Sequence, residues 1–397
     1  MPLPTTEAPA LQIRFLLHDV HGAGGGVLKV ALNLAGELGR RHDVELVSVL
    51  RRVDEPMHTM PSGVAVRTLL DERARAPDTD PAGLLPETAT KPPSRLILPE
   101  DPWYEQHSLD SDTQLLRYLR SVRGGVLIGM QPGLSVAIAR FAPAEVLRVA
   151  QEHRPFSSRP KALREASLRY YPRLDVFLTL TRRDARRYRR ELGEDVSVGV
   201  MPNGAPAVRG PTSDLDSLVV VAAGRLERSK GFDRLLDAWA IVARRHPDWE
   251  LRIFGEGGQR ADLEEQIATL DLAGSARLMG YTTRLSEEMV AASLFVLSSR
   301  VEGYPMVMLE AMACGLPVVS FDCRTGPREI IRPGRDGFLV PDGDVEGLAA
   351  AINRTIEMGD GRRALGAAAL RAARRRTQSA VAARWEQLLE RRLAAKR

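Results

Sequence analysis

Residues 218–245 read LVVVAAGRLERSKGFDRLLDAWAIVARR, and this stretch decides the fold. The apolar run 218–223 predicts a buried strand, and the spacing of apolar residues over 232–245 predicts an amphipathic helix. The loop between them, 224–231, carries glycines at both ends and two separated cations. A strand, a loop and a helix in this order are typical of parallel α/β sheets, which bind ligands at the carboxyl ends of their strands.

The loop has the residues that an anion requires. Arg225 can direct two donors at phosphate oxygens, Lys230 adds a point charge, and Gly224 lets the backbone come close to a ligand. An ordinary basic loop with no ligand explains this stretch equally well when it is taken alone.

The same alternation of strand and helix continues in both directions along the chain. Its length of 397 residues favours two domains. We therefore predict an α/β protein with two doubly wound, Rossmann-like domains. The predicted strands are 13–17, 44–50, 126–128, 146–150 and 176–180 in the first half and 218–223, 251–254, 294–297 and 317–320 in the second, and the clearest helices are 27–40 and 232–245.

Two interruptions and an amphipathic tail organise the chain. Seven prolines over 71–103 predict an inserted loop, and glycines and prolines over 203–217 predict a linker. We expect an N-terminal acceptor-side domain over 1–207 and a C-terminal domain that binds the nucleotide sugar over 208–378. The amphipathic tail 379–397 is expected to be a helix that packs back on the first domain.

A second polar motif, RVEGYPMVMLE, occupies residues 300–310. Pro305 suits the first turn of a helix, and Gly303 leaves the approach to its amides open, so a phosphate there would be stabilised. Glu302 precedes this helix. Glu310 lies inside it among apolar residues and therefore needs a partner. That partner is either a ribose diol or a buried cation, Arg225 or Arg300.

Together, 224–231 and 302–310 resemble the paired signature of glycosyltransferase family 4, G-R-x-x-x-x-K-G and E-x7-E. The likeness extends over the whole second domain and is looser in the first. It implies the GT-B fold, in which two Rossmann-like domains face a cleft. Further matching segments are 254–257, 280–281, 313–319 and 326–331, and in the first domain 25–26, 153, 180–181 and 201–204.

The resemblance also implies roles for single residues. Arg225 and Lys230 would grip the donor diphosphate and serve catalysis, and Glu310 would bind the ribose. Glu302, also predicted to be catalytic, would hold the transferred sugar together with the backbone of three following residues, Gly303, Tyr304 and Pro305. Tyr304 stands where the family usually has Phe.

In the first domain, the resemblance assigns contacts with the donor to three residues. Gly25 and Gly26 would bring backbone amides to the donor, although a glycine-rich turn by itself is weak evidence for any nucleotide. His153, just past a predicted strand, is predicted to be catalytic and to form a hydrogen bond with the donor sugar, although most histidines as a class are structural.

The implied reaction is metal-independent transfer of a hexosyl group, with retention of configuration, from a nucleoside diphosphate sugar, with a UDP-sugar as the favoured donor. The acceptor is a hydroxyl of a sugar, a lipid-linked molecule or a small molecule, and no cofactor is required beyond the donor. The alternatives are an epimerase or phosphorylase of the same fold, or a dinucleotide-dependent oxidoreductase. The last fits poorly because Val27 occupies the third glycine position of its motif.

Four Asp-x-Asp pairs could suggest a metal site, and we interpret all four as incidental. One lies in the proline-rich loop and one in the linker, while Asp112 precedes a helix expected at Thr113 and Asp344 is expected to cap a helix from Val345. No His-Glu-x-x-His motif is present. The four pairs are 78/80, 110/112, 214/216 and 342/344.

The net charge of +5 and the isoelectric point near 9.4 do not identify a partner. Basic residues, mostly arginines, cluster over 159–173 and 182–190. The simpler interpretation is that they lie on solvated helix faces. The more specific hypothesis is that they contact an anionic membrane that carries the acceptor. We expect no nucleic acid partner. Neither a signal peptide nor a membrane span is visible, so we expect a cytoplasmic protein, peripheral at most at the inner face of the membrane.

Overall fold

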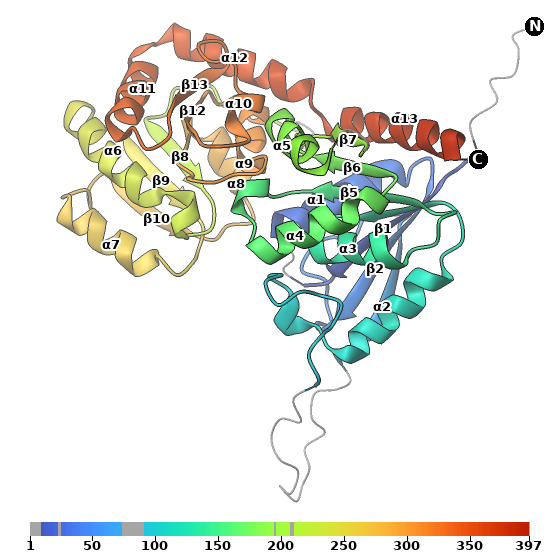
Figure 1. Ribbon diagram of the computed structural model, residues 1–397. Coiled ribbons are helices and arrows are strands. Elements are labelled where there is room, and N and C mark those ends of the chain that lie inside the picture. Colours follow the sequence, from blue (N-terminus) through green and yellow to red (C-terminus); the bar gives the residue numbers. More distant parts are fainter. Residues whose placement is uncertain (1–8, 23–24, 74–90, 194–195, 207–209, 397) are drawn as a thin grey trace, which may run out of the picture. The chain divides into compact units, whose positions relative to one another are not determined.

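The computed structural model describes residues 9–22, 25–73, 91–193, 196–206 and 210–396 (Figure 1). The chain divides into two compact units, each built on its own parallel sheet. The first unit contains Met1–Met201 and Val381–Arg397, and the second contains Pro202–Ala380. Within the described part, no helix is both long enough and apolar enough to cross a membrane.

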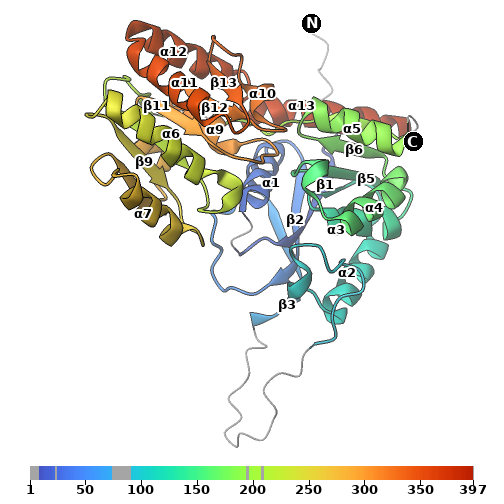
Figure 2. The ribbon, with the colours of Figure 1, turned by 60° about the vertical axis from the view of Figure 1, so that its left-hand side comes forward.

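The sheet of the first unit has seven parallel strands in the order β3-β2-β1-β4-β5-β6-β7. The chain reverses its direction across the sheet between β1 and β4, which is the place where open α/β sheets bind ligands. In Figure 2, α1 lies on one side of this sheet, and α2, α3 and α4 lie on the other. The elements are β1 (Gln12–Asp19), α1 (Gly25–Leu38), β2 (Asp43–Arg51), β3 (Ala65–Asp71), α2 (Leu109–Ser121), β4 (Val126–Gly129), α3 (Pro132–Phe141), β5 (Leu147–Glu152), α4 (Lys161–Tyr170), β6 (Val176–Thr179), α5 (Arg182–Leu192), β7 (Val198–Val200) and α13 (Gln378–Lys396).

The sheet of the second unit has six parallel strands in the order β10-β9-β8-β11-β12-β13. Here the reversal falls between β8 and β11, so the loops that follow these two strands flank the switch point. The elements are β8 (Val219–Ala223), α6 (Phe232–Arg245), β9 (Glu250–Phe254), α7 (Arg260–Thr269), β10 (Ala276–Gly280), α8 (Leu285–Val290), β11 (Leu294–Leu297), α9 (Met306–Ala313), β12 (Val318–Asp322), α10 (Pro327–Ile330), β13 (Gly337–Pro341), α11 (Val345–Glu357) and α12 (Asp360–Arg374).

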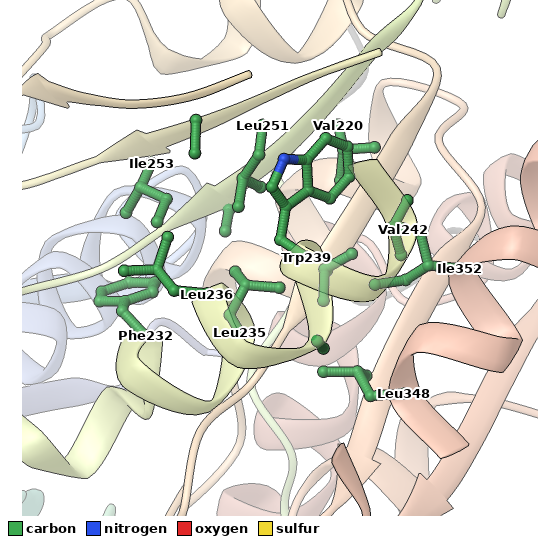
Figure 3. Close-up of a cluster of buried hydrophobic side chains, with 14 of the residues drawn as sticks. Val220, Phe232, Leu235, Leu236, Trp239, Val242, Leu251, Ile253, Leu348 and Ile352 are labelled. Atoms are coloured by element: carbon green, nitrogen blue, oxygen red, sulfur yellow. The ribbon is translucent and has the colours of Figure 1, made fainter. Parts of the chain in front are cut away.

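The core of the second unit explains why helix α6 forms where its apolar spacing predicts it. Trp239 is fully buried, and its indole nitrogen donates to the backbone carbonyl of Ser275 at 3.1 Å. Figure 3 shows this ring beside side chains from two strands and from α11. The labelled neighbours are Val220, Phe232, Leu235, Leu236, Val242, Leu251, Ile253, Leu348 and Ile352.

Helix α13 returns to the first unit and packs there with its apolar face. Trp385 and Leu389 are fully buried. Two ion pairs stabilise the polar side of the helix, one between Lys396 and Asp175 at 2.6 Å and one between Arg41 and Glu386 at 3.2 Å.

Several elements differ from the sequence expectations. Helix α1 begins at Gly25 rather than Val27, and α2 begins at Leu109 rather than Thr113 because Ser108 caps it, accepting a hydrogen bond from the amide of Ser111. Strands β3, β7, β10 and β13 were not predicted. Part of the proline-rich loop, 74–90, lies outside the described residues, as does 207–209 of the linker.

Candidate functional site

The loops after β8 and β11 are joined at the switch point of the second sheet. The amide of Arg300 donates to the carbonyl of Ser229 at 2.9 Å, and the hydroxyl of Ser298 donates to the carbonyl of Lys230 at 2.9 Å. Loop 224–231 therefore has a fixed position against the start of loop 298–305.

Glycine is required at two close contacts of loop 224–231. Gly231 has φ +66°, and a Cβ atom there would lie 2.2 Å from the carbonyl oxygen of Ser298. A Cβ atom on Gly255, in the loop after β9, would lie 1.9 Å from the carbonyl oxygen of Gly224. The backbones thus approach more closely than any side chain permits.

Lys230 and Glu302, 72 positions apart in sequence, meet at this place. The Lys230 ammonium lies 2.7 Å from Oε1 of Glu302, and the hydroxyl of Ser299 donates to the same oxygen at 2.7 Å. The lysine side chain is 23% exposed and the glutamate side chain 10%. The ammonium is therefore positioned by a carboxylate while part of it still faces solvent.

The two arginines of the motifs behave differently. Arg225 is 73% exposed, and its guanidinium pairs with Glu227 at 2.6 Å. Arg300 instead forks onto both oxygens of Asp233 at 2.6 and 2.5 Å, which fixes the start of α6. Among the described residues, neither arginine pairs with Glu310, so the ion pair considered for that half-buried carboxylate is not formed with them.

The turn before α9 has a defined backbone. Pro305 is the N-cap residue of α9 rather than its first helical residue, and Tyr304 is buried. The hydroxyl of Thr325 donates to the carbonyl of Glu302, and a Cβ atom on Gly326 would lie 2.7 Å from the Pro305 ring. The loop after β12 therefore supports the segment from Glu302 to the helix.

In the first unit, β5 ends at Glu152, directly before His153. The Glu152 carboxylate accepts from Arg159 at 2.8 Å and from the hydroxyl of Tyr171, so the backbone before His153 is held by a buried polar cluster. Burial lowers the pKa of His153 to about 4. Its Nε2 atom is buried and has no hydrogen-bond partner within the described residues.

The glycine-rich turn after β1 is organised by a residue that the sequence reasoning missed. The Asp19 carboxylate accepts from the amides of His21 at 2.7 Å and Gly22 at 3.0 Å. Gly25 and Gly26 open α1, and no atom lies within 4 Å of a Cβ atom placed on either. Asp19 could have been identified from its place at the end of a strand, because an aspartate there commonly accepts hydrogen bonds from the amides two and three residues further along the chain.

A buried polar cluster at the switch point of the first sheet was also missed. His18 Nδ1 lies 2.7 Å from His107 Nε2, and the His18 ring stacks on Trp103. Burial lowers the pKa of both histidines to about 3, so both are neutral near pH 7. Asp101 stabilises the segment that carries Trp103 and His107, because its carboxylate accepts a hydrogen bond from the amide of Gly133 at 3.1 Å.

Three of the four Asp-x-Asp pairs lie within the described residues, and each has a structural partner there. Asp112 accepts from Ser94 at 2.6 Å, Asp216 pairs with Arg363, and Asp344 caps α11 by accepting from Gly347 at 2.8 Å. The pair 78/80 lies outside the described residues. In the described part of the chain, no three His, Cys, Asp or Glu side chains gather as a metal site would need.

Comparison with protein families gives a match to the family described as "Glycosyl transferases group 1" over residues 208–372. An exopolysaccharide phosphotransferase of Streptomyces coelicolor is 36% identical over 372 residues, which is 92% of this chain and 39% of that protein. A lipopolysaccharide 1,6-galactosyltransferase of Salmonella typhimurium is 32% identical over 41% of this chain and 46% of its own length. The chain thus spans less than half the length of these relatives.

Solved structures share the fold. TarM of S. aureus, in a complex that contains UDP, has a TM-score of 0.77 at 13% identity, covering 96% of this chain and 99% of its own. HepE of Anabaena, in complex with UDP and glucose, has a TM-score of 0.74 at 18% identity, with coverages of 96% and 99%. At such identities the likeness concerns the fold alone.

Proposed function

Because residues 208–372 match the glycosyl transferases group 1 family, we propose that the chain transfers a hexosyl group from a nucleoside diphosphate sugar to an acceptor hydroxyl. We further propose that the anomeric configuration is retained and that the donor is UDP-linked. Two structural relatives were solved with UDP, which supports this choice of base.

The observation that carries the proposal is the position of Lys230 at the switch point of the second sheet, 2.7 Å from Glu302. Cleavage of a sugar–phosphate bond builds negative charge on the leaving diphosphate, so a fixed ammonium there would act where charge develops. Arg225 is exposed and can turn a forked donor toward a second phosphate. In this proposal no step requires a metal ion.

The other roles follow the same assignment. Glu310 would accept from the ribose hydroxyls, and Glu302 with the backbone of 303–305 would hold the transferred sugar. We assign to His153 a neutral hydrogen bond with that sugar, which its lowered pKa and unpartnered nitrogen support. Gly25 and Gly26 would offer backbone amides to the donor.

A second candidate function comes from the relative that matches 92% of this chain, an exopolysaccharide phosphotransferase. Such an enzyme would move a sugar together with its phosphate, so the bond that breaks lies within the diphosphate rather than at the anomeric carbon. The released nucleotide then differs, which makes the two reactions separable.

The test is incubation of the full chain with UDP-glucose, UDP-galactose and UDP-GlcNAc, with and without EDTA, followed by separation of UDP from UMP. We expect release of UDP from one donor, unaffected by EDTA. Release of UMP would support the phosphotransferase. Release of neither, together with no thermal stabilisation by any of the three donors, would contradict both.

A further inference from the structure

The helices that follow β5 and β6 concentrate the positive charge of the chain. Residues 161–191 contain ten Lys and Arg against four Asp and Glu, a net charge of +6, while the whole chain carries only +5. The six arginines of α5 are all exposed, because its buried face consists of Asp184, Ala185 and Tyr188. An anionic partner would therefore meet most of the net charge on this one region.

Three arginines, one from the neighbouring helix α3 and two from the region of α4, converge on a single ring at the end of α4. The guanidinium carbons of Arg140, Arg169 and Arg173 lie 5.1, 5.3 and 5.5 Å from the centre of the Tyr170 ring. All three side chains are exposed, and within the described residues none of them has a carboxylate partner. Like charges held together in this way repel one another, and a bound anion would relieve the repulsion.

A second group of arginines lies nearer the other end of α4. Arg164 of α4 and Arg187 of α5 lie 5.9 and 5.5 Å from the centre of the Phe156 ring. Arg187 also pairs with Glu191 at 2.8 Å. Phe156 follows His153 by three residues, so this group lies toward the carboxyl ends of the strands.

The two groups sit at different heights along one helix. From Arg164 to Tyr170 the axis of α4 rises by roughly 9 Å. Because Tyr170 ends the helix before the chain enters β6, its group lies toward the amino ends of the strands. A small anion can occupy one group only, whereas a chain with repeated negative groups can occupy both and continue toward His153.

We propose that α4 and α5 form a binding track for a polyanionic acceptor, a polymer that carries phosphate or carboxylate groups at regular intervals. This rests on the proposed function, because it assigns the acceptor class to the same transfer reaction. The polymer end nearest His153 would present the hydroxyl that receives the sugar.

An anionic membrane is the competing partner, and the side chains argue against it. Helices that lie on a bilayer bury an apolar face in it. The large apolar side chains that are exposed in the described structure are Met57, Val66, Leu218, Ile241, Met279, Tyr281 and Val301, and none of these lies on α4 or α5.

The test measures binding of the full chain to fluorescent polygalacturonate, to long-chain polyphosphate, to neutral dextran, and to vesicles of phosphatidylglycerol. The variant Arg140→Gln/Arg169→Gln/Arg173→Gln removes the Tyr170 group. Its matched control, Arg371→Gln/Arg374→Gln/Arg375→Gln, removes three exposed charges from the region of α12 in the second unit. We expect the first variant to bind one or both polyanions about tenfold more weakly, and the control to bind as the wild type does.

Three results would overturn the proposal: no binding of either polyanion, equal losses in both triple variants, or tighter binding to vesicles than to the polymers. Preference for polyphosphate or for polygalacturonate identifies the anionic group. Release of UDP from the donor without acceptor serves as a separate readout. This release should be the same in the Tyr170-group variant as in the wild type. If the wild type itself releases no UDP, the proposed function fails, whatever the result for polyanion binding.

Discussion

Lys230 is the residue on which the proposed chemistry depends most. Its ammonium is held at 2.7 Å by Glu302. We expect Lys230→Ala to lower kcat by about a hundredfold or more, because a fixed charge at a developing negative charge contributes at least that much. Donor turnover, measured beside a thermal melt that reports folding, checks this.

Arg228→Ala is the matched control, since Arg228 lies in the same loop and its side chain is exposed. Its carbonyl oxygen, which accepts from Arg300 at 3.0 Å, is retained in the variant. Turnover near that of the wild type is expected. An equal loss in both variants would mean that the loop responds to net charge and that Lys230 has no special role.

His153 is expected to act without titrating. Because its pKa is lowered to about 4, it is neutral throughout the range from pH 5.5 to 8. We expect His153→Gln, which keeps a neutral donor, to lose less kcat/KM than His153→Ala and to leave the shape of the pH profile unchanged. An inflection near pH 6.5 that vanishes in His153→Gln would contradict the assigned role.

At the scale of elements, the strands that sequence patterns missed share one property. β3 and β7 are the edges of the first sheet, and β10 and β13 are the edges of the second. An edge strand has a neighbour on one side only, so more of its residues face solvent: β3 has only exposed and half-buried positions, and exposed positions alternate with more buried ones in β10. The central strands are buried along most of their length and rich in apolar residues, and they were predicted for that reason.

Gly231 shows how an element depends on one position. A Cβ atom there would lie 2.2 Å from the Ser298 carbonyl oxygen, and the positive φ adds strain. We expect Gly231→Ala to destabilise the protein by about 2 kcal/mol or more and to reduce donor turnover. Gly258→Ala is the control, because nothing lies within 4 Å of its Cβ position. Urea unfolding of both variants measures these effects. Equal free energies of unfolding in the two variants would contradict the predicted steric clash with Ser298.

Helix α13 should contribute strongly to the stability of the first unit. Trp385 is fully buried, and its truncation to Ala would leave a large cavity. We expect Trp385→Ala to cost about 3–5 kcal/mol, whereas Gln387→Ala, at an exposed position of the same helix, should cost little. A melting temperature unchanged in Trp385→Ala would show that the helix is dispensable.

At the scale of the whole molecule, three histidines of the first unit link its stability to pH. Burial holds the pKa of His18 and His107 near 3 and that of His153 near 4, below the ordinary value of 6.5. The unfolded chain therefore binds more protons below pH 6.5, so these groups make the free energy of unfolding fall as the pH drops from 6.5 toward 3. Asp101 acts in the opposite sense, because burial raises its pKa.

Urea unfolding at pH 7.5 and pH 5.5 measures this dependence. We expect a smaller free energy of unfolding at the lower pH, and a smaller difference between the two values in His107→Gln than in the wild type. The difference in free energy of unfolding between the wild type and His107→Gln at pH 7.5 gives the cost of the substitution itself. A free energy that rises as the pH falls to 5.5 would contradict the prediction.

The candidate site was predictable in its parts but not in its connections. Loop 224–231 and Glu302 carry recognisable patterns, whereas the pairing of Lys230 with Glu302 depends on β8 and β11 being neighbours, which follows only from the strand order. The His18–His107 contact joins residues 89 positions apart and has no local pattern at all.

The return of α13 makes the second unit an insertion within the first, so the chain passes between them twice. Within the second unit, the segments next to the two passages are joined by hydrogen bonds: the amide of Ala205 donates to the carbonyl of Arg376 at 2.6 Å, and the amide of Gln378 donates to the carbonyl of Ala205 at 3.1 Å. A protease that cuts only one passage would therefore leave the two units joined by the other.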